Sequence, residues 1–174
     1  MNYGEIKKND IANGEGVRTS LFVSGCRHHC KNCFNAQTWD FAYGSPFTEK
    51  TMEEIFEACE PEWINGLSLL GGEPFEVENQ KVLLPFLIMF NERFKNKTVW
   101  CYSGFTIEEL LGKVKSRAYT DTTKEMLEQI DVLVDGEFIE EQKDISLVFR
   151  GSKNQRIIDV KQALATGEVV LYLK

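Results

Sequence analysis

The sequence predicts an α/β protein with a largely parallel sheet, because short apolar runs alternate with segments of helical periodicity along its 174 residues. Several of the apolar runs are followed by glycine or small polar residues, which mark the loops between elements. Hydrophobic residues make up 43% of the chain and charged residues 27%, the balance of an ordinary globular protein. We therefore expect a single domain that covers residues 1–174.

Three elements are predicted before residue 71. Residues 17–24 form an apolar run that ends at glycine, which predicts a strand. Apolar side chains at helical spacing then predict a helix over residues 50–59, with Thr48 or Thr51 as its N-cap. Residues 66–70 are again apolar and end at two glycines, which predicts a buried strand.

The middle of the chain predicts a long helix, a strand and a second helix. The long helix is expected over residues 79–94, where Pro85 either kinks it or marks its start. Its buried face is expected to carry these residues at helical spacing: Val82, Phe86, Met89, Phe90 and Phe94. Residues 97–102 follow as a strand, and Thr106 begins the capping-box pattern of a helix over residues 107–115.

The last third of the chain continues the alternation. A helix is expected over residues 121–129, and a strand over residues 130–136. Residues 146–151 are short and ambiguous, whereas residues 161–165 favour a helix and residues 168–173 a final strand.

Four loops are expected to converge on one face of the sheet. Parallel sheets carry their sites at the carboxyl ends of the strands. The loops that follow predicted strands are residues 26–33, 71–74, 103–104 and 135–136. Any site of this protein is therefore expected among them.

Charge and composition bound the partners and the compartment. The formal net charge of −7 argues against a nucleic-acid-binding surface, which is normally basic. Residues 1–5 contain no apolar signal core, and no stretch approaches the roughly 20 apolar residues of a membrane span. We expect a cytoplasmic protein, in which clustered cysteines indicate metal or redox chemistry and not disulfides.

Three of the five cysteines form a C-x3-C-x2-C run: Cys26, Cys30 and Cys33. Three thiolates on one loop can hold three corners of an iron–sulfur cube, and without a fourth cysteine one iron is left open. The alternative is a zinc site in which His28 or His29 is the fourth ligand. The two remaining cysteines are isolated among apolar residues and are expected to be buried: Cys59 and Cys101.

The cysteine spacing, with Gly71-Gly72-Glu73-Pro74 after the next strand, resembles the radical S-adenosylmethionine (SAM) superfamily. The resemblance implies a partial, open parallel β/α barrel and a [4Fe-4S] cluster whose open iron binds SAM. It implies cluster ligands at Cys26, Cys30 and Cys33, and SAM-binding residues at Asn32, Cys33, Phe34, Gly71, Gly72 and Glu73. Gly71 to Glu73 are expected at the amino group of SAM. Asn32 stands where the superfamily often has an aromatic residue, and Phe34 follows the third cysteine instead.

Asp135 ends the predicted strand over residues 130–136. It either caps the following loop or reaches the SAM ribose, and we include it among the candidate cofactor-binding residues. The polar, basic residues 150–156 are either a solvated surface or a contact for a partner or for the carboxylate of SAM.

Six segments are similar to the activating proteins of anaerobic ribonucleoside-triphosphate reductases: residues 1–3, 13–16, 21–26, 34–39, 131–138 and 149–156. This resemblance implies an enzyme that cleaves SAM reductively to a 5′-deoxyadenosyl radical and thereby generates a glycyl radical on the reductase. It also implies a flavodoxin-like electron donor. Phe149 departs from the tryptophan, and Leu70 from the serine or threonine, that this family tends to have.

Length is consistent with a protein substrate. A full (β/α)8 barrel needs about 200 residues or more, so this chain can form only a partial barrel whose open side a partner protein could close. Three other classes of protein remain open. One is an activase of another glycyl-radical enzyme; such activases often carry a cysteine-rich ferredoxin-like insert, which this chain lacks, but short activases without it remain possible. The others are a radical SAM enzyme with a small-molecule substrate, similar to a deazaguanine synthase, and a zinc-binding interaction module without enzymatic activity.

Overall fold

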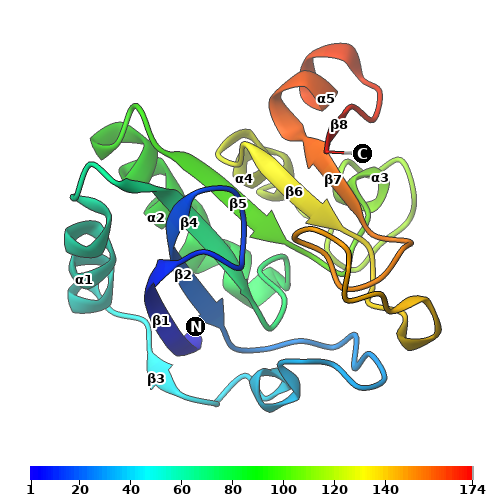
Figure 1. Ribbon diagram of the computed structural model, residues 1–174, viewed down its shortest axis with the longest axis horizontal. Coiled ribbons are helices and arrows are strands. Elements are labelled where there is room, and N and C mark those ends of the chain that lie inside the picture. Colours follow the sequence, from blue (N-terminus) through cyan, green and yellow to red (C-terminus); the bar gives the residue numbers. More distant parts are fainter. Residues whose placement is uncertain (174) are drawn as a thin grey trace.

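The computed structural model describes residues 1–173. Over these residues the chain forms an eight-stranded sheet with helices packed against it (Figure 1). The strands are β1 (Asn2–Asp10), β2 (Val17–Val23), β3 (Ser45–Pro46), β4 (Ile64–Gly71), β5 (Thr98–Tyr102), β6 (Val132–Asp135), β7 (Arg156–Asp159) and β8 (Leu171–Leu173). The helices are η1 (Ala36–Trp39), α1 (Glu49–Cys59), α2 (Val77–Arg93), α3 (Ile107–Leu110), α4 (Thr123–Glu128), η2 (Glu140–Gln142) and α5 (Val160–Thr166).

The sheet is mixed, with a parallel centre and antiparallel flanks. Its strand order is β3-β1-β2-β4-β5-β6-β7-β8, and the central run β2-β4-β5-β6 is parallel, as predicted. The flanking strands β1, β3, β7 and β8 pair antiparallel, so the prediction of a largely parallel sheet holds only for the centre. Since β3 and β8 end the order, the sheet formed by residues 1–173 is open.

The sequence does not predict β1 or β7, for two physical reasons. Most side chains of β1 are partly or fully exposed, and its residues are accordingly polar instead of forming an apolar run. β7 is four residues long, and within it Ile157 and Ile158 alone are buried. Neither strand carries the apolar pattern that identifies a strand buried in the centre of a sheet.

Helix α1 begins with the capping box that its sequence indicates. The hydroxyl of Thr48 accepts a hydrogen bond from the backbone N–H of Thr51, and the hydroxyl of Thr51 accepts one from the N–H of Thr48. Both predicted N-cap candidates therefore participate in one motif. Within residues 1–173, every helix falls short of the length and apolarity that crossing a membrane requires.

The structure decides between two alternatives for α2 and corrects one expectation. Helix α2 begins at Val77, so Pro85 lies inside the helix and does not mark its start. Met89, expected on the buried face, is 44% exposed, and the buried stripe of α2 instead consists of Leu83, Leu84, Phe86, Leu87 and Phe90. Because α2 is apolar around most of its circumference, helical spacing alone does not identify the face that packs on the sheet.

Helix α3 is shorter than the predicted residues 107–115, although the Thr106–Glu109 capping box is present. Gly112 adopts the left-handed conformation, with φ of 71°, and turns the chain away from the helix. Thr106 and Glu109 thus identify the start of α3 correctly, while the apolar pattern overestimates its length.

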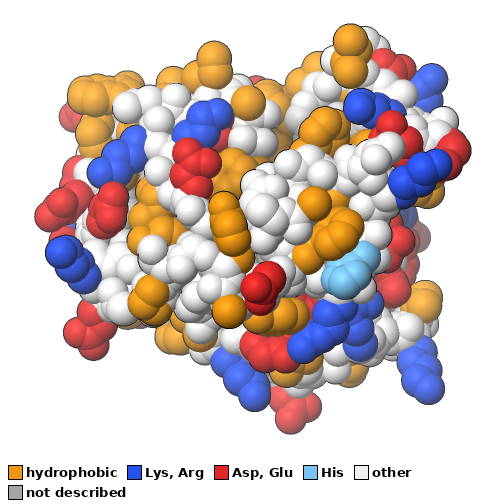
Figure 2. Space-filling model, turned by 90° about the horizontal axis from the view of Figure 1, so that it is seen from below, with side chains coloured by type: hydrophobic (Ala, Val, Ile, Leu, Met, Phe, Trp, Pro, Cys, Tyr) orange, Lys and Arg blue, Asp and Glu red, His pale blue; other side chains and the backbone are white. Residues whose placement is uncertain are grey.

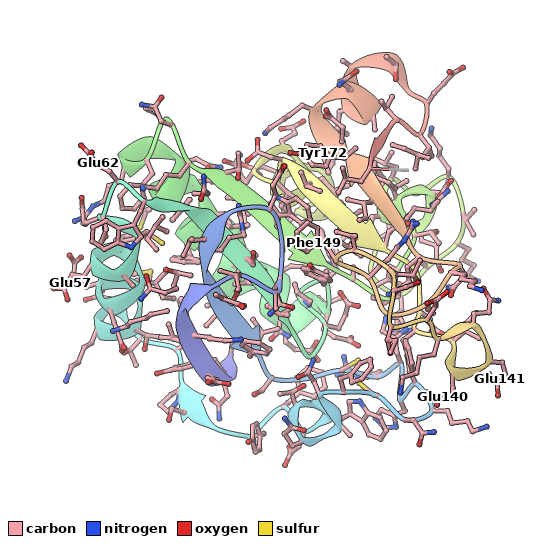
Figure 3. All side chains as sticks on the ribbon, in the orientation of Figure 1. Glu57, Glu62, Glu140, Glu141, Phe149 and Tyr172 are labelled. Atoms are coloured by element: carbon pink, nitrogen blue, oxygen red, sulfur yellow. The ribbon has the colours of Figure 1, made fainter. Side chains whose placement is uncertain are left out.

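A second apolar cluster lies around Trp100 of β5, apart from the main core. The indole of Trp100 is 1% exposed and packs edge-on against the rings of Phe149 and Tyr172, at centroid distances of 5.4 and 5.5 Å. Figure 3 labels Phe149 and Tyr172, which project from the C-terminal elements toward the central strands. The Tyr172 hydroxyl also donates a hydrogen bond to Glu15, at 2.5 Å. This contact ties β8 to the loop before β2.

Arg18 of β2 is buried beside Trp100 without a carboxylate partner among the described residues. Its guanidinium donates hydrogen bonds to the carbonyls of Glu15, Leu67 and Thr98 and to the hydroxyls of Ser68 and Thr98. Burial lowers the pKa of Arg18 to about 10. The buried cation therefore joins three parallel strands through their backbone.

Candidate functional site

The cysteine loop follows β2, and three residues with positive φ bend its backbone. Gly25 ends the strand in the left-handed region, with φ of 98°, where an added Cβ would lie 2.3 Å from the ring of Phe41. Within the loop, His29 and Asn32 are also left-handed, with φ of 54° and 55°. Histidine and asparagine tolerate this conformation better than most residues. These turns place all three cysteines along one cavity wall.

The beginning of α2 anchors the cysteine loop. The carboxylate of Glu76, which is 2% exposed, accepts a hydrogen bond from the backbone N–H of Arg27 at 2.8 Å and another from the Arg27 guanidinium at 2.6 Å. Asn79 donates to the carbonyls of Ser24 and Glu73, at 3.0 and 2.9 Å. One turn of α2 therefore fixes both the cysteine loop and the turn after β4.

Gly71-Gly72-Glu73 packs directly under the cysteine loop. The N–H of Gly72 donates to the carbonyl of Val23, and the N–H of Glu73 donates to the carbonyl of Gly25. A Cβ on Gly72 would lie 2.7 Å from the Gly25 carbonyl oxygen and 3.0 Å from that of Thr38. The absence of a side chain at Gly72 is therefore required for this close approach of backbone to backbone.

Glu73 is 1% exposed, and protein donors surround its carboxylate. One oxygen accepts from the Phe75 N–H and the Ser103 hydroxyl, both at 2.9 Å. The other accepts from the Gly104 N–H at 2.7 Å and lies 3.1 Å from Nε2 of His28. Glu73 therefore links the loop after β4 to the loop after β5 as well as lining the cavity.

His28 bridges two carboxylates in the cysteine loop. Its side chain is 3% exposed, with Nε2 facing Glu73 and Nδ1 at 2.5 Å from Glu137. Burial by itself lowers the pKa of His28, but the hydrogen bonds to Glu73 and Glu137 outweigh it, so the pKa is raised. His29 instead stacks on Trp39, with ring centroids 4.5 Å apart. His28 thus connects the cysteine loop with the loops after β4 and β6.

The predicted convergence of the four loops is confirmed. A cavity of about 570 Å³, within the usual size range of ligand pockets, is lined by residues of the loops after β2, β4, β5 and β6. The candidate residues that line it are Cys26, Cys30, Cys33, Phe34, Gly71, Gly72 and Glu73. Figure 1 shows the arrowheads of β5 and β6 pointing toward the lower right, where the loop after β6 lies.

Two candidate residues lie outside this lining. Asn32 is exposed at a turn of the cysteine loop. Asp135 is 1% exposed, and its carboxylate accepts from the Ile107 N–H at 2.8 Å and from the Arg156 guanidinium at 2.6 and 2.9 Å. Asp135 therefore supports α3 and β7 from behind the cavity, and its neighbour Gly136 lines the cavity instead.

The three cysteines offer a donor set suited to a soft metal centre. Burial raises the pKa of the Cys26 thiol to about 12 and also raises that of Cys30, so a metal that binds here displaces protons. Among residues 1–173, no three His, Cys, Asp or Glu side chains lie close enough to hold a single metal ion. Cys59 and Cys101 are fully buried in the core, as predicted.

The sequence does not identify several residues that shape the cavity. Glu76 and Glu137 contact the cysteine loop from 49 and 109 residues away, so no local pattern reveals them. Tyr102 lines the cavity with a buried hydroxyl that has no hydrogen-bond partner among the described residues. The sequence points to Tyr102 in one way only, because this residue ends the strand predicted over residues 97–102.

The face that carries the cysteine loop has mixed charge. Figure 2 shows this face from below, with Lys and Arg side chains interspersed with Asp and Glu, and with hydrophobic side chains between them. Two residues of the cysteine loop form ion pairs, Arg27 with Glu78 at 2.6 Å and Lys31 with Glu141 at 3.1 Å. On this face, contacts between neighbouring charges of opposite sign are therefore more important than a long-range electrostatic potential of a single sign.

A family model and several named proteins are similar to this chain over most of its length. Residues 12–158 match a family model described as a 4Fe-4S single cluster domain. The chain is 42% identical over 159 residues to proteins of Pasteurella multocida and Haemophilus influenzae, which covers 90% of this chain and 96% and 97% of theirs. It is 36% identical over 157 residues to a protein of Escherichia coli, which covers 89% of this chain and 96% of that protein. All three relatives are named anaerobic ribonucleoside-triphosphate reductase-activating protein.

Proposed function

The chain belongs to the family of anaerobic ribonucleoside-triphosphate reductase-activating proteins, and from this premise we propose that it activates such a reductase by generating a glycyl radical on it. The observation that carries the proposal is the shared cavity. Cys26, Cys30 and Cys33 line it together with Gly71 and Gly72 of the turn after β4. The proposed metal ligands and the proposed SAM-binding turn thus line the same cavity.

The three cysteines fit a [4Fe-4S] cluster with one iron open to SAM. They supply three thiolates from one loop, and no other cysteine lines the cavity within residues 1–173. A bound cluster that has received one electron from a donor would cleave SAM to methionine and a 5′-deoxyadenosyl radical, and this radical would take a hydrogen atom from a glycine of the reductase to give 5′-deoxyadenosine and a glycyl radical. The residues of this chain bind, orient and shield these groups.

The turn after β4 is proposed to meet the amino group of SAM. Gly71 and Gly72 expose backbone to the cavity, and Glu73 holds this turn against the loop after β5. Phe34 is proposed at the adenine end, since its ring is 65% exposed, lines the cavity and packs on Phe138 at 5.4 Å. The roles of Asn32 and Asp135 in SAM binding stay predictions.

The open sheet is consistent with a protein substrate, because a second protein can pack against the side that the sheet does not close. We propose that residues 1–174 form a single radical SAM domain of the partial-barrel type and that the reductase closes its open side. A flavodoxin-like protein is the proposed electron donor. The main support for a protein substrate is that two hydrophobic residues of the cavity lining are exposed, Phe34 at 65% and Ile145 at 96%.

The decisive experiment is anaerobic reconstitution with iron and sulfide, followed by addition of SAM, a reductant and the reductase. A doublet electron paramagnetic resonance signal from a glycyl radical on the reductase is the expected result. Cleavage of SAM without that signal would favour a small-molecule radical SAM enzyme. Zinc in place of iron would favour an interaction module.

Cysteine variants provide matched controls for the cluster. Replacing Cys26, Cys30 or Cys33 by Ala is expected to abolish iron binding, measured as iron and sulfide per chain after reconstitution. Cys59→Ala removes an equally small side chain from the core, where Cys59 is 0% exposed, and is expected to leave the iron content unchanged. Equal iron content in all four variants would contradict the assignment of the ligands.

A further inference from the structure

Arg150 lines the cavity with a guanidinium that is largely without partners. Its Nη1 donates to the Gln155 carbonyl at 3.0 Å, while its Nε is buried and has no hydrogen-bond partner among the described residues. The other arginines are engaged by carboxylates or, for Arg18, by carbonyls and hydroxyls. Those paired with carboxylates are Arg27, Arg93, Arg117 and Arg156. The Nη2 of Arg150 has no hydrogen-bond partner among the described residues and is not among the buried atoms, so this amino group of a cavity-lining residue is available to a ligand.

The loop around Arg150 is held in place. The side-chain oxygen of Gln155 accepts from the N–H groups of Gly151 and Ser152, at 2.8 and 3.1 Å, and its amide donates to the Gly136 carbonyl. The preceding residue, Phe149, is left-handed with φ of 54°, an unusual conformation for an aromatic residue, and its ring packs on Trp100. These contacts hold the backbone that positions Arg150 at the cavity wall.

The charges along this wall favour an anion. Lys143 also lines the cavity, and within residues 1–173 neither Lys143 nor Arg150 forms an ion pair. The acidic residues of the lining are already engaged, Asp144 by Lys153 at 3.5 Å and Glu73 by its hydrogen-bond donors. A planar guanidinium with free donors matches the two oxygens of a carboxylate.

We propose that Arg150 binds a carboxylate in this cavity. The inference rests on the proposed function, which supplies two sources of that group. One is the methionine carboxylate of SAM, and the other is an acidic side chain of the reductase segment that enters the cavity. Pairing through the amino groups of the guanidinium neutralises a cation that forms no ion pair within residues 1–173.

The first arm of the test uses the full chain with its reconstituted cluster. Dissociation constants for SAM and for decarboxylated SAM are measured by equilibrium dialysis for the wild type, Arg150→Gln and Arg150→Lys. Arg150→Gln is expected to weaken SAM binding about 10- to 100-fold, the effect of losing hydrogen bonds to a charged group. It should leave the affinity for decarboxylated SAM unchanged, and Arg150→Lys should lie between the two.

The second arm measures binding of the reductase without SAM. If Arg150→Gln weakens this complex about tenfold or more and leaves SAM affinity intact, the carboxylate belongs to the reductase and the proposed pairing stands. If neither affinity changes, the proposal is overturned. It is also overturned if the affinities for SAM and decarboxylated SAM fall equally, because Arg150 then only supports the loop.

Two controls separate the possible failures. Arg93→Gln removes a guanidinium that pairs with Glu60 at 2.6 Å, outside the cavity lining, and should change neither affinity. Because both SAM ligands are compared on the same preparation, a partly unfolded variant lowers the number of sites and leaves the ratio of affinities interpretable. Failure of the wild type to cleave SAM would refute the proposed function, whereas the Arg150 inference depends on the comparison of variants.

Discussion

Glu73→Gln is expected to destabilise the protein even without cluster or SAM. The carboxylate of Glu73 is 1% exposed and accepts from the Phe75 N–H, the Ser103 hydroxyl and the Gly104 N–H, at 2.7–2.9 Å. A glutamine keeps one acceptor oxygen and turns an N–H2 group toward donors. At least one backbone hydrogen bond is then lost, that from the Gly104 N–H or that from the Phe75 N–H, and such a bond contributes about 1.5–3 kcal/mol when the acceptor is charged. The free energy of unfolding should therefore fall by about 1.5 kcal/mol or more.

The assay is urea unfolding of cluster-free protein under anaerobic, reducing conditions, followed by far-ultraviolet circular dichroism. Glu60→Gln is the matched control, because Glu60 pairs with Arg93 at 2.6 Å but is 52% exposed at its side chain. Exposed ion pairs contribute little, so this control should change stability only slightly. If Glu73→Gln is no more destabilising than Glu60→Gln, the carboxylate does not connect the two loops as its contacts indicate.

Three further predictions concern stability and the turn after β4. Arg18→Met should lower the free energy of unfolding in urea by about 3 kcal/mol or more, since the buried carbonyls of Leu67 and Thr98 lose donors; a loss under about 1 kcal/mol would contradict this. Burial alone raises the pKa of Asp10, but the hydrogen bonds it accepts hold the pKa below its ordinary value. Its stabilisation is therefore present above the unfolded pKa of about 4 and lost as pH falls through the folded pKa, so the stability gap between wild type and Asp10→Asn should close in acid. Gly72→Ala should weaken SAM binding in equilibrium dialysis because its Cβ meets backbone carbonyls at 2.7–3.0 Å, and unchanged affinity would refute that constraint.

Local sequence signals predict the parts of the fold that local physics determines. The Thr48 and Thr106 capping boxes, the parallel central strands and the loops after them each depend on residues within a short window. The antiparallel strands β1 and β7 are less predictable because their stability comes from pairing with strands already identified. The apolar pattern of α2 predicts a helix but not which residues face the sheet, as Met89 illustrates.

The residues of the candidate site also form two groups, one that local sequence motifs predict and one that they do not. The cysteine spacing and the glycine pair are local motifs, and the cavity brings them together. The contacts that hold them are not local. Glu76, Glu137 and Arg150 reach the cysteine loop or the cavity from distant elements, and no spacing in the sequence relates them to the cysteines. Asp135 is a residue that the sequence proposes for the site but that does not line the cavity. Its position at a strand end does not determine which side of the loop its carboxylate faces.

The tie between Tyr172 and Glu15 has a consequence for biosynthesis. These residues are 157 positions apart, and Tyr172 also packs on Trp100, in the middle of the sheet. On the ribosome the central strands emerge and can associate before β8 exists, since domains form from the N-terminal side during synthesis. The contacts of Tyr172 with Trp100 and Glu15 therefore form only after β8 has been synthesised. Until then the indole of Trp100 lacks the ring of Tyr172, one of the two aromatic rings that pack edge-on against it.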